Sequence, residues 1–297
     1  MKKTIFTAII GRANTGKSTL LNTLLGEKIA IVSNKPQTTR TKITGITSRG
    51  DTQYVFLDTP GIHKPQDKLG SFMMRAASDA ATGVDLILYI VSAGDRIGPI
   101  EENLMKRFKE IDVPVVLLVN KTDISRAEQI GDTILRFSGK YDFAAVIPIS
   151  AKNGDNTNII FDEIDKYATE TDEWIFPDDM ITDQPERQIA AEFIREKLLR
   201  LLSEEIPHGV AVVIEEWKET SKLLSIRAEI FCEKASHKPI IIGKGGATLK
   251  KVGEMAREDL EAFFGMKVYL DLWVKVKENW RESDFAVGNL GFKREEF

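Results

Sequence analysis

The feature that most constrains this chain is a loop near its N-terminus that contains glycine and lysine. The loop is Gly11–Ser18, with the sequence GRANTGKS. It follows Ile5–Ile10, an apolar β-branched run typical of a buried strand, and it leads into Lys17–Leu25, whose apolar residues have helical spacing. Backbone N–H groups of such a loop converge on a phosphate, and the helix dipole adds to the attraction. The pattern therefore predicts a nucleoside triphosphate site in an α/β fold and leaves the base undetermined.

Two side chains of this loop have expected roles of their own. Lys17 is placed to reach the β- and γ-phosphates, and the Ser18 hydroxyl is placed to bind magnesium. The other positions offer main-chain N–H groups to the phosphates. The expected nucleotide contacts of the loop are Gly11, Arg12, Ala13, Asn14, Thr15, Gly16, Lys17, Ser18 and Thr19.

The choice of base is indicated by Asn120-Lys121-Thr122-Asp123. This tetrapeptide lies at the carboxyl end of an expected buried strand, Val113–Val119, where open parallel sheets bind ligands. The Asp123 carboxylate can accept two hydrogen bonds from the N1–H and N2 amino edge of guanine, a donor pair that adenine lacks. The stem of Lys121 is expected to lie along the base plane. Alone, such a tetrapeptide is as often a helix cap, but downstream of a phosphate loop it indicates guanine.

A second strand end is expected to hold the metal and the γ-phosphate. The run Tyr54–Leu57 leads into Asp58-Thr59-Pro60-Gly61. We expect Asp58 to hold magnesium through water, and we expect the Gly61 N–H to bind the γ-phosphate.

A polar, threonine-rich stretch, residues 33–41, precedes the next expected strand, residues 42–49. One of its hydroxyls, that of Thr39 in preference to Thr38, is expected to ligate magnesium only while the γ-phosphate is present. A loop with this property senses hydrolysis.

The segment Ser150-Ala151-Lys152 follows another expected strand, Ala145–Ile149, and is expected to support the guanine through a main-chain N–H. The nucleotide contacts expected outside the phosphate loop are Asp58, Thr59, Pro60, Gly61, Ile62, Asn120, Lys121, Asp123, Ser150, Ala151 and Lys152. The expected magnesium ligands are Ser18, Thr39 and Asp58.

Length and composition limit the alternatives. A chain of 297 residues allows about two domains. No apolar run approaches the ~20 residues of a membrane span, so we expect a soluble protein, and its start leads directly into a strand, which leaves no room for a signal peptide. The single cysteine, Cys232, fits a reducing compartment. A net charge of −4 excludes a uniformly basic nucleic-acid-binding protein but not a local basic patch.

Strand and helix patterns alternate up to about Tyr167, which predicts a first domain over residues 1–168. Residues 169–187 are acidic and lose the periodicity, so we interpret them as a linker. Residues 188–297 are expected to form a second domain, in which a helix (188–205), two strands (210–215 and 223–232), a further helix from about Thr248 and a last strand (267–276) follow one another.

The second domain contains a GxxG loop, Gly243–Gly246, in a lysine-rich stretch. Residues 234–251 include five lysines and no acidic residue. Glycines at both ends let an RNA backbone approach closely and Lys244 supplies charge, which is the way a KH module holds about four nucleotides of single strand. A simple glycine hinge is the alternative interpretation. The expected RNA contacts are Lys238, Ile241, Ile242, Gly243, Lys244, Gly245, Gly246, Lys250 and Lys251.

Taken together, these motifs resemble the Era family, bacterial GTPases with a C-terminal KH domain in the TrmE-Era-EngA-like superfamily. The resemblance covers nearly the whole chain and rests on Gly11–Thr19, Gln37–Arg40, Asp58–His63, Asn120–Asp123, Ser150–Lys152, Phe176–Asp179, Thr182–Gln184, Arg195–Lys197, His237–Lys238, Gly243–Gly246 and Leu272–Val276. It implies a P-loop GTPase domain with a mixed, mostly parallel sheet, followed by a smaller α+β KH domain.

The same resemblance implies partners and a location. It implies binding near the 3′ end of 16S ribosomal RNA and a role in maturation of the small ribosomal subunit. It also implies a cytoplasmic protein that associates peripherally with the inner membrane; separately, we expect a monomer. We expect such a protein to bind RNA more tightly with a GTP analogue than with GDP, because a switch needs different affinities in its two states.

One position departs from the pattern of many small GTPases. They carry a glutamine after Asp-x-x-Gly to orient the attacking water, whereas this chain has Ile62, so slow hydrolysis is expected. GTPases that resemble this one use an asparagine at the position of Asn14 to help hold potassium near the phosphates; the alternative is that Asn14 only caps the loop. His63 is a second candidate for positioning water. The expected catalytic residues are Asn14, Lys17, Thr39, Asp58 and Gly61.

Two rival functions stay open at the level of sequence. A P-loop kinase would share the phosphate loop but would not need Asn120–Asp123 or Ser150–Lys152. An RNA-binding regulator that holds GTP with negligible turnover is compatible with the missing glutamine.

Overall fold

The computed structural model describes residues 1–35, 37–61, 68–79 and 83–290. Contacts between residues divide the chain into two compact units. The first comprises Met1–Ala30, Thr39–Lys64 and Met73–Asp183, and the second comprises Ile31–Thr38, Pro65–Phe72 and Gln184–Phe297.

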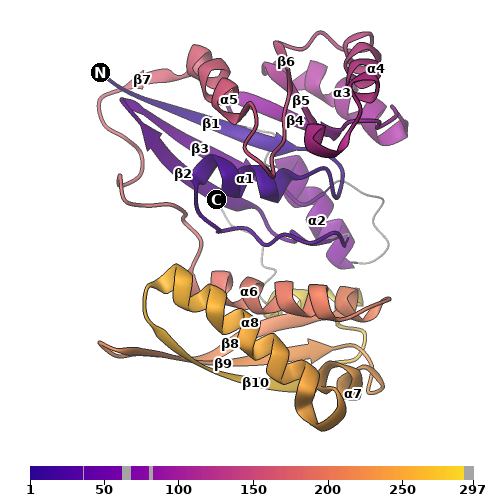
Figure 1. Ribbon diagram of the computed structural model, residues 1–297, viewed down its shortest axis with the longest axis vertical. Coiled ribbons are helices and arrows are strands. Elements are labelled where there is room, and N and C mark those ends of the chain that lie inside the picture. The colour runs from indigo at the N-terminus through magenta and orange to yellow at the C-terminus, as the bar shows by residue number, and fades with distance from the viewer. Residues whose placement is uncertain (36, 62–67, 80–82, 291–297) are drawn as a thin grey trace. The chain divides into compact units, whose positions relative to one another are not determined.

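The first unit is built on one mixed sheet with the strand order β2-β3-β1-β4-β5-β6 (Figure 1). The strand β7 pairs with the N-terminal residues of β1. The strands are β1 (Lys2–Ile10), β2 (Ile43–Arg49), β3 (Thr52–Asp58), β4 (Leu86–Ser92), β5 (Val115–Asn120), β6 (Ala145–Pro148) and β7 (Thr169–Thr171). β2 and β7 are antiparallel to their neighbours, and the other pairs are parallel. This mostly parallel sheet agrees with the expected fold class.

Helices cover both faces of this sheet. On one face, Phe108 of α3 (Pro99–Ile111) and Phe137 of α4 (Ala127–Ser138) pack against Tyr89 of β4. On the other face, Phe161 of α5 (Thr157–Ile164) packs against two rings of β3. Both faces of the central strands are therefore buried. This is why the sequences of these strands are nearly continuous apolar runs.

Parallel pairing brings the carboxyl ends of β1, β3, β5 and β6 to one edge of the sheet. The phosphate loop follows β1 and leads into α1 (Lys17–Leu25). The other three strand ends lead into the segments that begin at Asp58, Asn120 and Ser150. Ligand sites of open α/β sheets lie at this edge.

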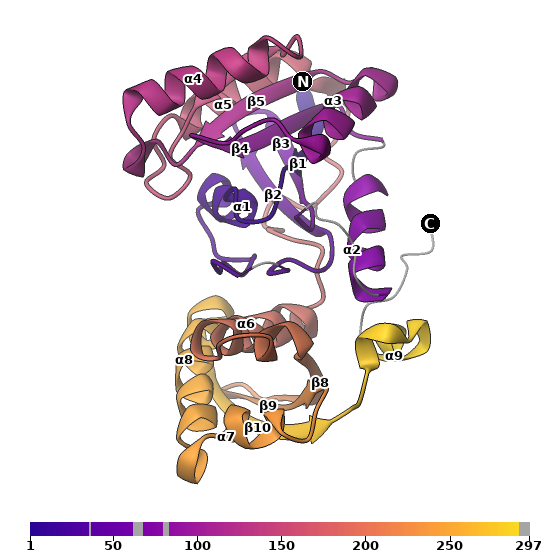
Figure 2. The ribbon, with the colours of Figure 1, turned by 90° about the vertical axis from the view of Figure 1, so that its right-hand side faces the viewer.

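The second unit contains a three-stranded sheet in the order β10-β9-β8. Its strands are β8 (Ala211–Glu219), β9 (Leu223–Cys232) and β10 (Lys267–Val276), with β9 and β10 parallel. The helices α6 (Glu186–Leu201), α7 (His237–Ile242) and α8 (Ala247–Phe264) are grouped along these strands (Figure 2). Their apolar faces and the sheet share one buried cluster. A short helix, α9 (Asp284–Asn289), follows.

The acidic stretch expected to be a linker is largely attached to the first unit. β7 forms within it, and the Gln53 side chain exchanges hydrogen bonds with the main chain of Phe176, at 2.8 and 3.0 Å. Farther on, the Thr182 hydroxyl donates to the Thr44 carbonyl at 2.6 Å. The boundary between the units falls after Asp183.

Two segments from the N-terminal half belong to the second unit. One is Ile31–Thr38, and the other includes the first residues of α2 (Lys68–Asp79). No local sequence pattern predicts that these two segments belong to the second unit. Among the described residues, no helix is long and apolar enough to span a bilayer.

Candidate nucleotide site and RNA-binding loop

Two glycines fix the shape of the phosphate loop. Gly16 has φ +103°, and a Cβ there would lie 2.2 Å from the Asn120 side-chain nitrogen. A Cβ on Gly11 would lie 2.3 Å from the Ile90 carbonyl oxygen. Any side chain at either position would therefore displace the loop from the neighbouring strands β4 and β5. The loop closes further through the Thr15 hydroxyl, which donates to the Arg12 carbonyl at 3.0 Å.

Lys17 is folded into the loop that it is expected to serve. Its ammonium donates to the carbonyls of Gly11 at 3.2 Å and Arg12 at 2.8 Å. Burial lowers the pKa of Lys17 to about 8, and the nearby Asp58 acts in the opposite direction. A phosphate in the loop would place a negative charge beside this buried ammonium and would favour its charged form.

The three predicted magnesium ligands lie together. The Ser18 hydroxyl donates to Asp58 Oδ2 at 2.6 Å and lies 2.8 Å from the Thr39 hydroxyl oxygen. The second oxygen of Asp58, Oδ1, is buried and has no hydrogen-bond partner among the described residues. Burial raises the pKa of Asp58 to about 6, against the opposing effects of Lys17 and Ser18. Two hydroxyls and a carboxylate with an unmet oxygen are the hard donors that magnesium prefers, so the residues fit this ion.

Gly61 lies against the phosphate loop. A Cβ on Gly61 would lie 2.6 Å from the Ala13 Cα atom, so only glycine permits this approach. Thr59 is buried, and its hydroxyl donates to the Ile9 carbonyl at 3.0 Å, which joins the ends of β1 and β3. The predicted site residues Ile62 and His63 lie outside the described residues.

Asn120 connects two loops of the site. Its side-chain nitrogen donates to the Thr15 carbonyl at 2.7 Å, and its oxygen accepts from the Ala151 N–H at 2.9 Å. With 3 % of its surface exposed, Asn120 holds the phosphate loop against the Ser150–Lys152 loop. Sequence reasoning placed it among the nucleotide contacts, and the structure gives its side chain this bridging role.

The carboxylate expected to read the base, that of Asp123, is exposed and is oriented by its neighbours. Asp123 lies in a 3₁₀ turn, Thr122–Ile124, and its Oδ1 accepts from the Ser150 hydroxyl at 3.0 Å. Lys121 adopts φ +69°, and its ammonium donates to the Asn14 carbonyl at 2.7 Å. The turn, Ser150 and Lys121 thus bring Asp123 and the phosphate loop to one site.

Sequence reasoning missed two supporting residues. The Thr23 hydroxyl of α1 donates to the Ala151 carbonyl at 2.6 Å and so supports the Ser150–Lys152 loop. Glu101 of α3, almost fully buried, forms an ion pair with the Arg12 guanidinium at 3.4 Å, so the Arg12 side chain is turned toward α3. No short motif marks Thr23 or Glu101, because each acts through a contact far from it in sequence.

In the second unit, the GxxG loop has the predicted open form. Gly243, Gly245 and Gly246 all have positive φ, and a Cβ on Gly243 would lie 2.3 Å from the Thr248 hydroxyl. Nothing lies within 4 Å of a Cβ built on Gly245 or Gly246, so the loop surface is open there. Lys244 is exposed, as are the other lysines expected to contact RNA, namely Lys238, Lys250 and Lys251.

One expected RNA contact needs correction. Ile241 is fully buried in the core of the second unit, because α7 turns this position toward the sheet. Its side chain therefore supports the loop from beneath. Ile242 is partly buried beside it, and Ile240 is 51 % exposed.

The site combines a phosphate loop, two hydroxyls beside a buried carboxylate and a second, exposed carboxylate at the carboxyl edge of the sheet. Together with the GxxG module, these features are those of a GTPase with a KH domain. The family of 50S ribosome-binding GTPases matches residues 6–121, and the KH domain family matches residues 205–281. The chain belongs to the Era family of GTPases: it is 49% identical over 294 residues to GTPase Era of Clostridium kluyveri, covering 99% of this chain and all of that protein.

Other Era proteins are also similar to nearly the whole chain. GTPase Era of Caldanaerobacter subterraneus is 49% identical over 97% of each chain. A solved Era in complex with MgGDPNP and nucleotides 1506–1542 of 16S ribosomal RNA shares 40% identity at a TM-score of 0.94, covering 98% of this chain and 99% of that one. A Tyr→Ala variant of Aquifex aeolicus Era bound to GDP and AlF4⁻ superposes over the same shares with a TM-score of 0.93 and 40% identity.

Proposed function

We propose that this GTPase binds the 3′ region of 16S ribosomal RNA through its KH domain and assists assembly of the small ribosomal subunit. The solved Era complex with 16S nucleotides matches nearly the whole chain. The open glycine loop with its exposed lysine, Lys244, offers the matching chemistry in the second unit.

One observation supports the assignment of the nucleotide site: Ser18, Thr39 and Asp58 cluster next to a buried ammonium, and Asp58 Oδ1 has no hydrogen-bond partner in the part of the chain that the structure describes. In the proposal, Lys17 and the loop amides bind the phosphates, and Asp123 reads guanine. Thr39 and Gly61 respond to the γ-phosphate, which is present in GTP and absent in GDP. Magnesium, held by Ser18, Thr39 and Asp58, would neutralise phosphate charge during transfer.

Competition between nucleotides tests the base assignment. Fluorescent GDP bound to the purified protein with magnesium should be displaced by GTP and by GDP but not by ATP. Equal displacement by ATP would contradict a guanine site and would favour a P-loop kinase.

Crosslinking tests the RNA partner. RNA crosslinked in cells to the protein held in its GTP state should map to the 3′ end of 16S ribosomal RNA, and Lys244→Ala should reduce the yield there. Reads spread evenly over ribosomal RNA would contradict the proposal.

We also propose that potassium stimulates hydrolysis through Asn14. This residue is exposed at the loop, with φ +65°, and its carbonyl is already held by Lys121. A cation beside the phosphates would partly replace the charge that an arginine finger supplies. Turnover should be faster in potassium than in sodium for the wild type, and Asn14→Ala should remove the difference. Equal rates in all four conditions would rule out this role.

Location follows from the resemblance alone. We propose a monomeric cytoplasmic protein that associates peripherally with the inner membrane. Cell fractionation with an antibody to the native protein would test both compartments, and recovery outside the cytoplasm and the membrane fraction would contradict this placement.

A further inference from the structure

The segment that precedes Thr39 is held by a helix of the second unit. Residues 31–38 join α1 to β2, yet they belong to the same compact unit as α6. Ile31 is 1 % exposed and lies in the buried cluster that contains Ile189 and Phe193 of α6. This part of the loop is therefore anchored to a helix about 160 positions farther along the chain.

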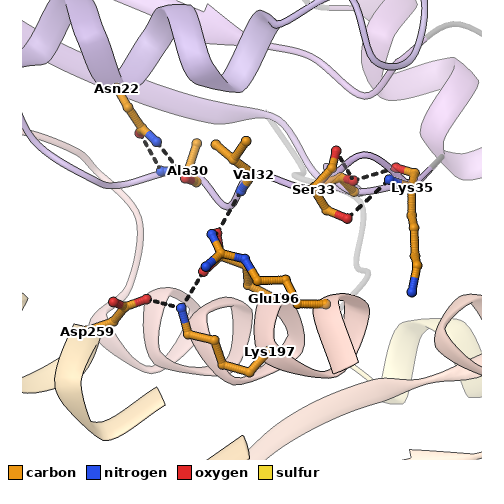
Figure 3. A network of polar contacts seen from close by, with 10 residues as sticks. Asn22, Ala30, Val32, Ser33, Lys35, Glu196, Lys197 and Asp259 are labelled. Atoms are coloured by element: carbon orange, nitrogen blue, oxygen red, sulfur yellow. Dashed lines mark hydrogen bonds and ion pairs between the residues drawn. The ribbon is translucent and has the colours of Figure 1, made fainter. Parts of the chain in front are cut away.

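Polar groups of α6 contact this segment at several points, and Figure 3 shows one of them, the hydrogen bond between Val32 and Glu196. Glu196 Oε1 accepts from the Val32 N–H at 3.0 Å. The Lys35 ammonium donates to the carbonyls of Leu199 and Leu202, at the end of α6 where carbonyls lack helical partners. Contact with these carbonyls fixes Lys35 against the helix terminus.

Of these contacts, the one made by Arg195 lies nearest to Thr39 in the sequence. Its guanidinium donates to the Thr38 carbonyl through Nη2 and to the Gln37 carbonyl at 3.4 Å through Nη1. Glu192 orients the guanidinium with two further bonds, at 2.7 and 2.5 Å. Arg195 is 1 % exposed, so its charge serves buried partners.

Three consecutive charged residues of α6 are buried in this way. Arg195, Glu196 and Lys197 have exposures of 1 %, 0 % and 2 %. Lys197 pairs with Glu196 at 2.6 Å and with Asp259 of α8, which ties the group to the helix that follows the GxxG loop (Figure 3). Apolar residues could fill this space without the desolvation cost of buried charges. The buried charges are therefore better explained by the specific contacts that they make than by stability. Two of the three bind the main chain of residues 32–38, which places that segment in one position.

The peptide bond between Thr38 and Thr39 connects this fixed segment to the nucleotide site. The Thr38 carbonyl oxygen and the Thr39 nitrogen and Cα lie in one rigid plane. Holding the Thr38 oxygen therefore restricts where Thr39 can lie, and the Thr39 hydroxyl is 2.8 Å from that of Ser18 in the magnesium cluster.

We propose that Arg195 is a positioning residue for Thr39: by binding the Thr38 carbonyl, it presents the Thr39 hydroxyl to magnesium and the γ-phosphate. The nucleotide state then reaches α6, and the KH domain with it, through residues 32–38. The inference rests on the proposed function in one respect only, that Thr39 responds to the γ-phosphate.

Nucleotide affinities without RNA test this role. GDP has no γ-phosphate, so a loss of Thr39 positioning should weaken a non-hydrolysable GTP analogue and spare GDP. We expect Arg195→Ala to lower analogue affinity about fivefold or more, within the usual range of coupling, and to leave GDP affinity unchanged. Arg195→Lys, which keeps one donor, should recover part of the loss. Arg187→Ala, which removes an exposed charge of the same helix, is the matched control.

The outcomes separate the inference from its alternatives. Unchanged analogue affinity in a folded Arg195→Ala protein would overturn the inference, and so would an equal loss for GDP and analogue, which indicates a purely structural role. If Arg195→Ala does not fold, Lys35→Met removes the neighbouring anchor without altering α6, and the same two results decide.

A second readout uses RNA. In the wild type, RNA affinity should differ between analogue and GDP, and in Arg195→Ala this difference should vanish. A wild type without any difference would refute the proposed coupling to RNA while the nucleotide affinities still test Arg195. A variant that keeps the full wild-type difference would overturn the inference.

Discussion

At the scale of single residues, the proposed selection of guanine depends on the oriented carboxylate of Asp123. Ser150 donates to one of its oxygens, so the side chain is held in place before the base arrives. An ionised carboxylate only accepts hydrogen bonds, and it therefore matches the two donors of the guanine edge.

Replacing this carboxylate by an amide should reverse the preference. In Asp123→Asn the amide nitrogen is a donor and would face the N2 amino group of guanine, whereas xanthine has a carbonyl there. We expect GTP affinity to fall about 100-fold or more and xanthosine triphosphate to become the better ligand. Calorimetric titration with both nucleotides measures this change.

Asp132→Asn, an exposed change on α4, is the control and should bind GTP normally. Undiminished GTP affinity in Asp123→Asn would show that another group reads the base.

At the scale of elements, the GxxG turn provides an exposed positive charge at the start of α8. Gly245 and Gly246 leave the approach open, and Lys244 lies between Gly243 and Gly245. Lys244→Ala should weaken binding of a single-stranded RNA and lower the slope of log affinity against log salt by about 1.

The matched change is Lys222→Ala, an exposed lysine in the turn between β8 and β9. Equal slopes for Lys244→Ala and the wild type, measured by fluorescence anisotropy over a range of salt concentrations, would place the RNA elsewhere.

The buried charges of α6 also have a predicted cost. Lys197→Met keeps the length of the side chain but leaves Glu196 and Asp259 without this cation. Breaking a buried pair in this way should lower the free energy of unfolding by about 3 kcal/mol. Urea titration followed by tryptophan fluorescence suits the measurement, because Trp217, Trp273 and Trp280 all lie in the second unit.

Lys218→Met, at a solvent-exposed pair with Glu216, should lower the free energy of unfolding far less than Lys197→Met, because water screens an exposed ion pair. A similar small cost for Lys197→Met would mean that the buried network contributes little to stability.

Elements were predictable where a local pattern determines them. The expected strands at 223–232 and 267–276 coincide with β9 and β10, because alternation records which side faces the core. The end of α7 was less certain, since three successive isoleucines give no period: Ile241 is buried and Ile240 is exposed. The packing of residues 31–38 on α6 was not predictable, because the partners lie far apart in sequence. The run Arg195-Glu196-Lys197 between two buried apolar positions was the available signal.

At the scale of the whole molecule, residues 31–38 connect the chain of the proposed nucleotide site to α6 of the second unit. Chain connectivity from Thr38 to Thr39 links the residues held by α6 to the proposed magnesium ligands Ser18, Thr39 and Asp58. A nucleotide can shift RNA binding only if the two states differ in their affinity for RNA.

The most direct measurement is therefore the affinity of one RNA for the protein in each of two nucleotide states. A labelled single strand with the 3′-terminal sequence of 16S ribosomal RNA would be titrated with the wild-type protein bound to a non-hydrolysable GTP analogue, and separately bound to GDP. The account predicts binding that is tighter with the analogue by about fivefold or more. Identical affinities in the two states would contradict it.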